Sequence, residues 1–185
     1  MPQKAFSILI ADDDIITQKM IQKMFTRKGY QVLSVGDGAE AWNMLQKRYF
    51  PIVITDWHMP KMSGIELCQK IRETTFPGYV FTILLTSRDS KADIIEGLEA
   101  GADDYLTKPL DYHELTARLK AAERILTLER SLKESNDSLK KALEEIKVLS
   151  ITDPLTGAFN RRYMLEYMEI ELKRSKRYNH SFSFI

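Results

Sequence analysis

Residues 7–14 read Ser-Ile-Leu-Ile-Ala-Asp-Asp-Asp, an apolar run that ends abruptly in three consecutive carboxylates. A continuous apolar run, as opposed to an alternating one, is typical of a parallel strand whose two faces are both covered by helices. The stretch therefore predicts the first strand of a buried parallel sheet. Further short runs with strand character, several of them also continuous, lie at residues 32–35, 52–55, 79–86 and 104–107.

Stretches with helical spacing separate these runs, and glycine or proline stands at many of the joints, such as Gly29, Pro51 and Gly101. Strands that alternate with helices imply right-handed crossovers and a sheet wound in both directions. We therefore expect an α/β fold over residues 1–125, with a doubly wound, five-stranded parallel sheet. In such a sheet the ligand site lies at the carboxyl ends of the strands, where the strand order reverses.

Charged side chains stand where the predicted strands end. Asp12 and Asp13 follow the first strand, Asp56 ends the third, and Lys108 follows the fifth. Carboxylates that converge from two strand ends repel each other unless a hard cation such as Mg²⁺ lies between them. A carboxylate beside bound Mg²⁺ can attack a phosphoryl group to give an acyl phosphate, and a nearby lysine can pair with another phosphoryl oxygen.

Other features at these strand ends have more than one interpretation. Thr86 or Ser87, at the end of the fourth strand, could donate a hydroxyl to the phosphoryl group. Taken separately, Asp13 or Asp14 could cap the following helix, and Lys108 could be a solvated surface charge. Taken together, four strand ends supply matching residue types in the right order, so the phosphoryl-transfer site is the better interpretation.

Four segments resemble the receiver domain of response regulators, in the family's order and over residues from about 4 to 125. They are Ile8 to Asp14, Ile54 to Gly64, Leu84 to Ser87, and Gly101 to Pro109. The resemblance implies a flavodoxin-like receiver fold in which Asp56 accepts a phosphoryl group from a sensor histidine kinase. It also implies that Mg²⁺ is held by Asp12, Asp13, Asp56 and the backbone carbonyl of His58.

The same resemblance implies roles for three further residues. Lys108 would bind the phosphoryl group, Thr86 would move towards it, and Tyr105 would be the aromatic side chain that switches inward. His58 occupies a position at which family members vary, so its side chain would tune the lifetime of the phosphoryl group.

Residues 111–150 contain no proline, glycine or strand pattern and predict one long helix. A series of mostly apolar positions along it is spaced alternately by three and four: Ile125, Leu128, Leu132, Ser135, Leu139, Ala142, Ile146 and Leu149. This spacing is typical of a coiled-coil seam. We therefore expect residues 126–150 to form a coiled-coil linker in a homodimer, with a single helix whose outer face is solvated as the alternative. The poor helix formers of residues 134–138 are its weak point.

Residues 153–162 read Asp-Pro-Leu-Thr-Gly-Ala-Phe-Asn-Arg-Arg and resemble the opening of the GGDEF domain, the diguanylate cyclase family. Ala158 stands where that family usually has leucine. We expect residues 151–185 to be the N-terminal fragment of such a domain, with a helix capped by Thr152 or Asp153 and a strand opening at residue 181. The family's Gly-Gly-Asp/Glu-Glu-Phe turn is absent, so the chain as given lacks the cyclase active site. A longer parent would bind GTP and make cyclic di-GMP.

The residues leave two hypotheses about function and argue against two other functions. The leading hypothesis is a phosphorylation-controlled dimerisation switch that feeds a cyclase, and the alternative is a dimeric receiver adaptor without cyclase output. An aspartate-based phosphatase of the haloacid dehalogenase type would need an acidic residue where this chain has His58. A flavin-binding flavodoxin would not place the acidic loop of residues 12–14 against a phosphate.

Composition excludes several other classes. Lys and Arg number 27 against 26 Asp and Glu, a balance that argues against a dedicated nucleic-acid binder. Cys68 is the only cysteine, which rules out an internal disulfide framework and favours a core thiol. Nothing resembles a signal peptide or a membrane span. We expect a cytoplasmic protein with no membrane or nucleic-acid partner.

Overall fold

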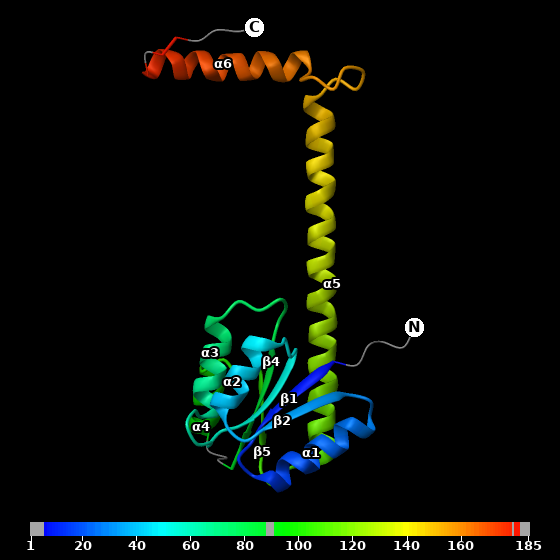
Figure 1. The fold of residues 1–185 in the computed structure, drawn as a ribbon, viewed down its shortest axis with the longest axis vertical. Helices are drawn as coiled ribbons and strands as arrows, with labels where there is room; N and C mark the ends of the chain where they lie inside the picture. The colour runs from blue at the N-terminus through cyan, green and yellow to red at the C-terminus, as the bar shows by residue number, and fades with distance from the viewer. Residues whose placement is uncertain (1–5, 88–90, 179, 182–185) are drawn as a thin grey trace. The chain divides into compact units, whose positions relative to one another are not determined.

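The computed structural model describes residues 6–87, 91–178 and 180–181. The chain divides into two compact units, Met1–Ser131 and Leu132–Ile185. Within the described ranges, none of the helices is both long and apolar enough to cross a membrane. In chain order the elements labelled in Figure 1 are β1 (Ser7–Ala11), α1 (Ile15–Arg27), β2 (Gln31–Val35), α2 (Gly38–Lys47), β3 (Ile52–Asp56), α3 (Gly64–Glu73), β4 (Phe81–Thr86), α4 (Lys91–Glu99), β5 (Asp104–Thr107), α5 (Tyr112–Ile151) and α6 (Arg161–Tyr178).

The strands of the first unit form one parallel sheet in the order β2-β1-β3-β4-β5. The chain moves outward from β1 to β2, returns to β3 on the other side of β1, and continues outward through β4 to β5. This path confirms the predicted doubly wound, five-stranded sheet. The strand order reverses between β1 and β3, so the carboxyl ends of these two strands flank the crevice in which such sheets bind ligands.

Alternate residues of the central strands face opposite helix layers. Ile8 and Ile10 of β1 pack with residues of α1 and α5, whereas Leu9 and Ala11 pack with residues of α2 and α3. All four are fully buried. Burial of a side chain such as Ile10 contributes about 1.5–3 kcal/mol. Because both layers are apolar, β1 has no polar face, and this is the reason that its sequence is continuous rather than alternating.

The first turns of α5 pack on the sheet through Leu115, Leu119, Ala122 and Leu126, all of them buried as the helical spacing predicts. The helix then continues without a break through residues 134–138, where the Ser138 hydroxyl donates to the Glu134 carbonyl at 2.9 Å. The large apolar side chains of the predicted seam are exposed on the single chain; they are Ile125, Leu128, Leu132, Leu139, Ile146 and Leu149.

The predicted start of the last helix is wrong by several residues. The helix begins at Arg161, and the Asn160 side-chain oxygen accepts from the Tyr163 amide at 3.0 Å as a helix cap does. The Asp153 carboxylate closes a turn instead, because it accepts from the amide of Thr156 at 3.0 Å. In this turn Gly157 has a φ of 70°, which a helix cannot accommodate. Of the predicted strand from residue 181, residues 182–185 lie outside the described residues.

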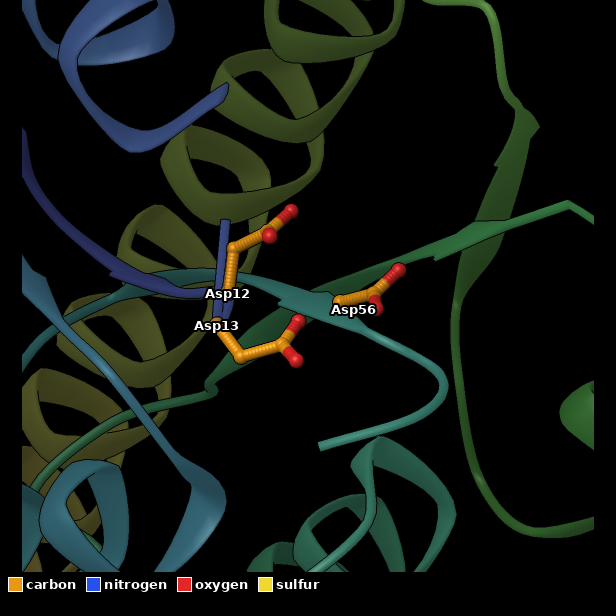
Figure 2. Close-up of side chains that lie close together, drawn as sticks. All are labelled: Asp12, Asp13 and Asp56. Carbon is orange, nitrogen blue, oxygen red and sulfur yellow. The ribbon is translucent and has the colours of Figure 1, made fainter. Parts of the chain in front are cut away.

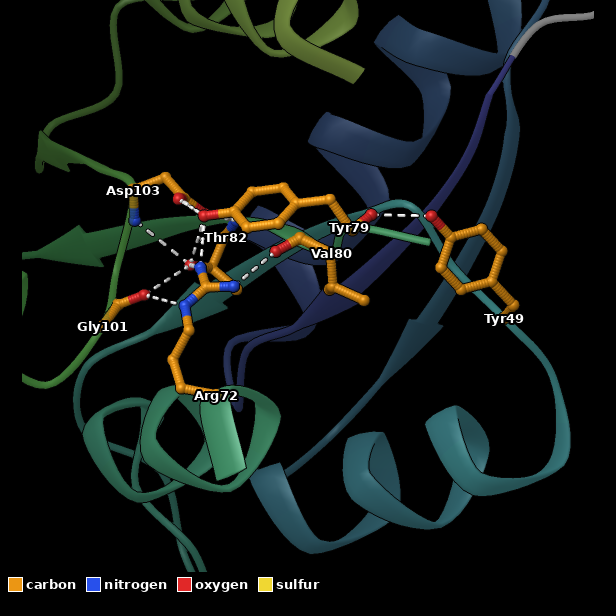
Figure 3. A network of polar contacts seen from close by, with 7 residues as sticks. All are labelled: Tyr49, Arg72, Tyr79, Val80, Thr82, Gly101 and Asp103. Atoms are coloured by element: carbon orange, nitrogen blue, oxygen red, sulfur yellow. Dashed lines mark hydrogen bonds and ion pairs between the residues drawn. The ribbon is translucent and has the colours of Figure 1, made fainter. Parts of the chain in front are cut away.

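A polar network ties α3 to the amino ends of β4 and β5 (Figure 3). The Arg72 guanidinium forms an ion pair with Asp103 at 2.5 Å and donates to the carbonyls of Gly101 and Val80 at 2.7 and 2.9 Å. Gly101 has a φ of 99°, and a Cβ there would lie 2.5 Å from Arg72 Cγ. The close approach of the arginine therefore depends on glycine at position 101. Tyr79 also donates to Asp103, and Tyr49 donates to the Tyr79 carbonyl.

We expect Arg72→Met to destabilise the first unit by about 2 kcal/mol, because it removes the cation paired with the mostly buried Asp103 carboxylate and the guanidinium donors to two carbonyl groups. Urea unfolding followed by circular dichroism measures the free energy of unfolding. Arg124→Met, which removes an exposed guanidinium from α5, is the matched control and should change that free energy little. Equal losses in the two variants would contradict the assignment of Arg72 as the centre of the network.

Candidate functional site

The fold brings the ends of β1 and β3 side by side. Ala11 of β1 pairs with Thr55 of β3, so Asp12 and Asp56 are the next residues on two adjacent parallel strands. The Asp12 amide continues the sheet by donating to the Val35 carbonyl at 3.3 Å. Asp12 is fully buried and Asp56 nearly so. Two carboxylates are thus fixed at the switch point by strand pairing rather than by a flexible loop.

Asp13 joins them. Each of Asp12, Asp13 and Asp56 offers a carboxylate oxygen that lies within 4.8 Å of the others, and Figure 2 shows the three side chains converging. Asp14 points elsewhere and is the N-cap of α1, where its carboxylate accepts from the amides of Ile16 and Thr17. The capping interpretation is therefore right for Asp14, while Asp13 belongs to the cluster.

Lys108 reaches both buried carboxylates from the loop after β5. Its ammonium lies 3.0 Å from Asp12 Oδ2 and 2.8 Å from Asp56 Oδ1. Its amide donates to the Thr86 carbonyl at 2.7 Å, which extends the pairing of β4 and β5 by one residue. The peptide bond that follows, to Pro109, is cis. Lys108 is therefore part of the site and not a solvated surface charge.

The charges of the site do not balance. Three carboxylates against one ammonium leave two negative charges uncompensated. Burial raises the pKa of Asp12 above its ordinary value, and the bonds from the Asp14 amide and Lys108 only partly oppose this effect. Burial lowers the pKa of Lys108, but its bonds to Asp56 and Asp12 outweigh burial and raise the pKa overall.

The residues present fit a hard divalent cation. Carboxylate oxygens are the ligands that Mg²⁺ and Ca²⁺ prefer, and two positive charges would match the two uncompensated negative ones. The raised pKa of Asp12 reflects the cost of burying its carboxylate charge, which a nearby cation would reduce.

The remaining predicted site residues lie on β4, on β5 and in the loop after β3. Thr86 ends β4 and is buried, one residue beyond Leu85, which pairs with Asp56. Tyr105 of β5 is half-buried against the cluster that contains Trp57. His58 follows Trp57 in the loop after β3, and its exposed ring stacks on the indole with centroids 6.2 Å apart. The roles of these side chains, and that of the His58 carbonyl, stay predictions.

Gly64 contributes to the site by its lack of a side chain, a part that the sequence pattern alone does not indicate. A Cβ at this position would lie 2.2 Å from the Asp56 carbonyl oxygen, and the Gly64 amide donates to the Trp57 carbonyl at 3.0 Å. A side chain here would displace the backbone of Asp56. The available signal was the Ser-Gly pair at residues 63–64, directly before a helical pattern.

A family profile described as "Response regulator receiver domain" matches residues 8–120, which is more than half of the chain. The chain belongs to this family. The matched range contains all of the sheet except Ser7, the first residue of β1, together with the acidic cluster and Lys108, and it ends within α5. The receiver fold predicted from the four segments is thereby confirmed.

Curated relatives agree with this assignment. Response regulator RppA of Synechocystis sp. is 39% identical over 149 residues, which cover 75% of this chain and 63% of RppA. Response regulator MprA of Mycobacterium ulcerans is 35% identical over 83% of this chain and 65% of its own length. A protein of Bacillus subtilis named uncharacterized transcriptional regulatory protein YrkP is 40% identical over 72% of this chain and 56% of its own. The chain thus spans less than two thirds of the length of these relatives.

Solved structures resemble the receiver domain alone. The receiver domain of Francisella response regulator 1452 aligns with a TM-score of 0.61 and 33% identity, covering 64% of this chain and 97% of that one. The receiver domain of the TMAO respiratory system response regulator TorR aligns with a TM-score of 0.60 and 36% identity, over 65% and 98%. The likeness is therefore to a complete receiver domain.

The raised pKa of Asp12 has a consequence for stability. The folded receiver domain binds a proton on Asp12 more tightly than the unfolded chain does. The stability that this difference contributes is therefore fully present below the ordinary aspartate pKa of about 4. It is lost as the pH rises through the raised pKa. With divalent ions chelated, we expect Asp12→Asn to be more stable than the unchanged protein at pH 7.

We expect this stability gap to close as the pH falls to about 4. Urea unfolding of both proteins along the pH series measures it, and the difference between them cancels the titration of other groups. A gap that does not vary with pH would contradict the assignment of Asp12 as the buried carboxyl with a raised pKa.

Proposed function

We propose that the chain is the phosphoryl-accepting part of a two-component response regulator, with Asp56 as the acceptor and a sensor histidine kinase as the donor. The main support for this proposal is that the two buried carboxylates, Asp12 and Asp56, differ in their exposure. Asp56 keeps 11% of its side chain exposed, whereas Asp12 keeps none. Both oxygens of Asp12 are already engaged, one by the Asp14 amide at 2.8 Å and the other by Lys108. Asp56 is therefore the carboxylate that an incoming phosphoryl group can reach.

The side chains would share the work of the transfer. The Asp56 carboxylate forms an O–P bond as the N–P bond of the donor histidine breaks. Lys108 already lies 2.8 Å from Asp56 and would pair with a phosphoryl oxygen once that carboxylate has become an acyl phosphate. Mg²⁺, held by Asp12, Asp13, Asp56 and the carbonyl of His58, would neutralise the charge that develops on the phosphoryl oxygens. The Thr86 hydroxyl would bind the new group, and Tyr105 would follow it inward.

Incubation with acetyl phosphate tests the acceptor. We expect one phosphoryl adduct by intact mass, formed only in the presence of Mg²⁺ and absent from Asp56→Asn. Asp14→Asn is the matched control, because it neutralises a neighbouring carboxylate outside the cluster and keeps a good helix cap. An adduct of equal yield on Asp56→Asn would contradict the proposal. If no adduct appears, binding of beryllofluoride, a stable mimic of the phosphoryl group, distinguishes a short-lived adduct from an inactive site.

The second half of α5 supports a homodimer. The seam residues Leu128, Leu132 and Leu139 are each more than half exposed on the single chain, and Ile146 and Leu149 continue the row. Such a stripe at three-four spacing is stabilised when a second helix covers it. In our proposal phosphorylation alters the receiver surface and thereby the pairing of two α5 helices.

We expect Leu139→Lys to convert the dimer to a monomer, because it places a charge in the buried seam. Light scattering after size-exclusion chromatography measures the mass. Val148→Lys is the matched control, since Val148 is also exposed but lies off the seam, and this variant should stay dimeric. A monomeric mass for the unchanged protein would contradict the proposal that this seam joins two chains.

The output is proposed to be cyclic di-GMP synthesis by a longer parent chain, on the strength of the GGDEF-like segment at residues 153–162. The name of the relative YrkP, a transcriptional regulatory protein, favours a second candidate, transcriptional regulation. Both readings are compatible with a shared receiver domain. The coding sequence beyond Ile185 distinguishes them, because a Gly-Gly-Glu-Glu-Phe-like turn supports the cyclase and a DNA-binding motif supports the regulator.

A further inference from the structure

An ion pair lies on the loop that leaves the acceptor strand. This loop, residues 57–63, connects β3 to α3 and begins directly after Asp56. In its middle, Lys61 Nζ lies 2.6 Å from Asp37 Oδ2. Asp37 is the N-cap of α2, and its other oxygen accepts from the Glu40 amide at 2.7 Å. The buried carboxylate of Asp37 thus joins the loop to the start of α2.

The backbone at Lys61 is in an unfavourable conformation. Lys61 has a φ of 64°, and among the described residues it is the one non-glycine residue with a positive φ. For a residue with a Cβ this conformation costs about 1–2 kcal/mol. The surrounding structure must therefore hold the loop in place, and the Asp37 contact is at the strained residue itself.

A second contact brings the same two segments together. A Cβ at Gly38 would lie 2.4 Å from the Met62 carbonyl oxygen, so the start of α2 touches the backbone of the loop next to Lys61. The ends of the loop are fixed separately. The Trp57 amide donates to the Leu85 carbonyl at 2.8 Å, and Ser63 forms a capping box with Glu66 on α3.

We propose that Lys61 and Asp37 are a positioning pair for the cation site of the receiver domain. The inference rests on the proposed function, in which the carbonyl of His58 is a ligand supplied by this loop. Lys61 touches no reacting atom. Its role is to hold the middle of the loop against α2, so that the loop carbonyl stays aligned with Asp12, Asp13 and Asp56 before the cation arrives.

The sign of one effect separates positioning from simple electrostatics. A lysine charge near a cation site repels the cation, so removal of that charge alone would tighten Mg²⁺ binding. Loss of a positioning contact would weaken it. Lys61→Met therefore gives opposite results under the two explanations.

The experiment is a Mg²⁺ titration followed by tryptophan fluorescence, since Trp57 adjoins Asp56. The variants are Lys61→Met, Asp37→Asn and the two combined, at a temperature where circular dichroism shows each one folded. We expect each single change to raise the dissociation constant for Mg²⁺ roughly tenfold. The combined variant should be no weaker than either single one, because both remove the same contact.

Three controls make the test specific. Lys61→Arg keeps the cation and should bind Mg²⁺ like the unchanged protein. Lys47→Met removes an exposed lysine from the other end of α2 and should have no effect. Lys61→Gly relieves the backbone strain while it removes the contact, so it should weaken Mg²⁺ binding without lowering the unfolding temperature measured in EDTA.

Unchanged or tighter Mg²⁺ binding by Lys61→Met would overturn the inference while leaving the proposed function intact. A protein that binds no Mg²⁺ with Lys61 and Asp37 both in place would overturn the proposed function and the inference with it. The two failures are therefore distinguishable in one titration series.

Discussion

The structure depends on the placement of like charges beside each other in a nearly dry crevice. Asp12 is fully buried next to Asp56, and the sheet fixes both backbones. Repulsion between carboxylates in such a place is much stronger than in water. Lys108 offsets part of it, and a divalent cation would offset the rest. The same imbalance that costs stability also favours cation binding at this point of the molecule, which the proposed phosphoryl transfer needs.

Much of this arrangement could be predicted because it follows from local pattern and strand topology. The apolar runs predicted all five strands, and the absence of glycine and proline after Asp111 predicted α5. Parallel strands align their carboxyl ends, so residues at these ends were expected to meet without knowledge of any contact. Asp12, Asp56 and Lys108 are brought together for this reason. The burial of Cys68, which raises its pKa to about 12, follows from helical spacing in the same way.

Contacts between segments without periodicity could not be predicted. The pairing of Asp37 with Lys61 joins a helix cap to a loop, and nothing in either segment indicates the other. The network around Arg72 also depends on three-dimensional approach, including the room left by Gly101. The start of α6 was misplaced because proline is favoured in a first helical turn, whereas here the carboxylate of Asp153 closes a turn ahead of the helix.

The side chains of β1 pack alternately on two helix layers, and this packing restricts which changes the strand tolerates. Substitution of one apolar residue of the strand by another leaves every other side chain facing the same helix layer. An inserted or deleted residue is different, because it would send Ile10 to the layer of α2 and α3 and Leu9 to that of α1 and α5. The same insertion or deletion would shift the register of β1 on β3, so that Asp12 would no longer lie beside Asp56. The length of β1 and the chemistry of the site are therefore coupled in this chain, because a change of length disturbs both the packing of the strand and the pairing of Asp12 with Asp56.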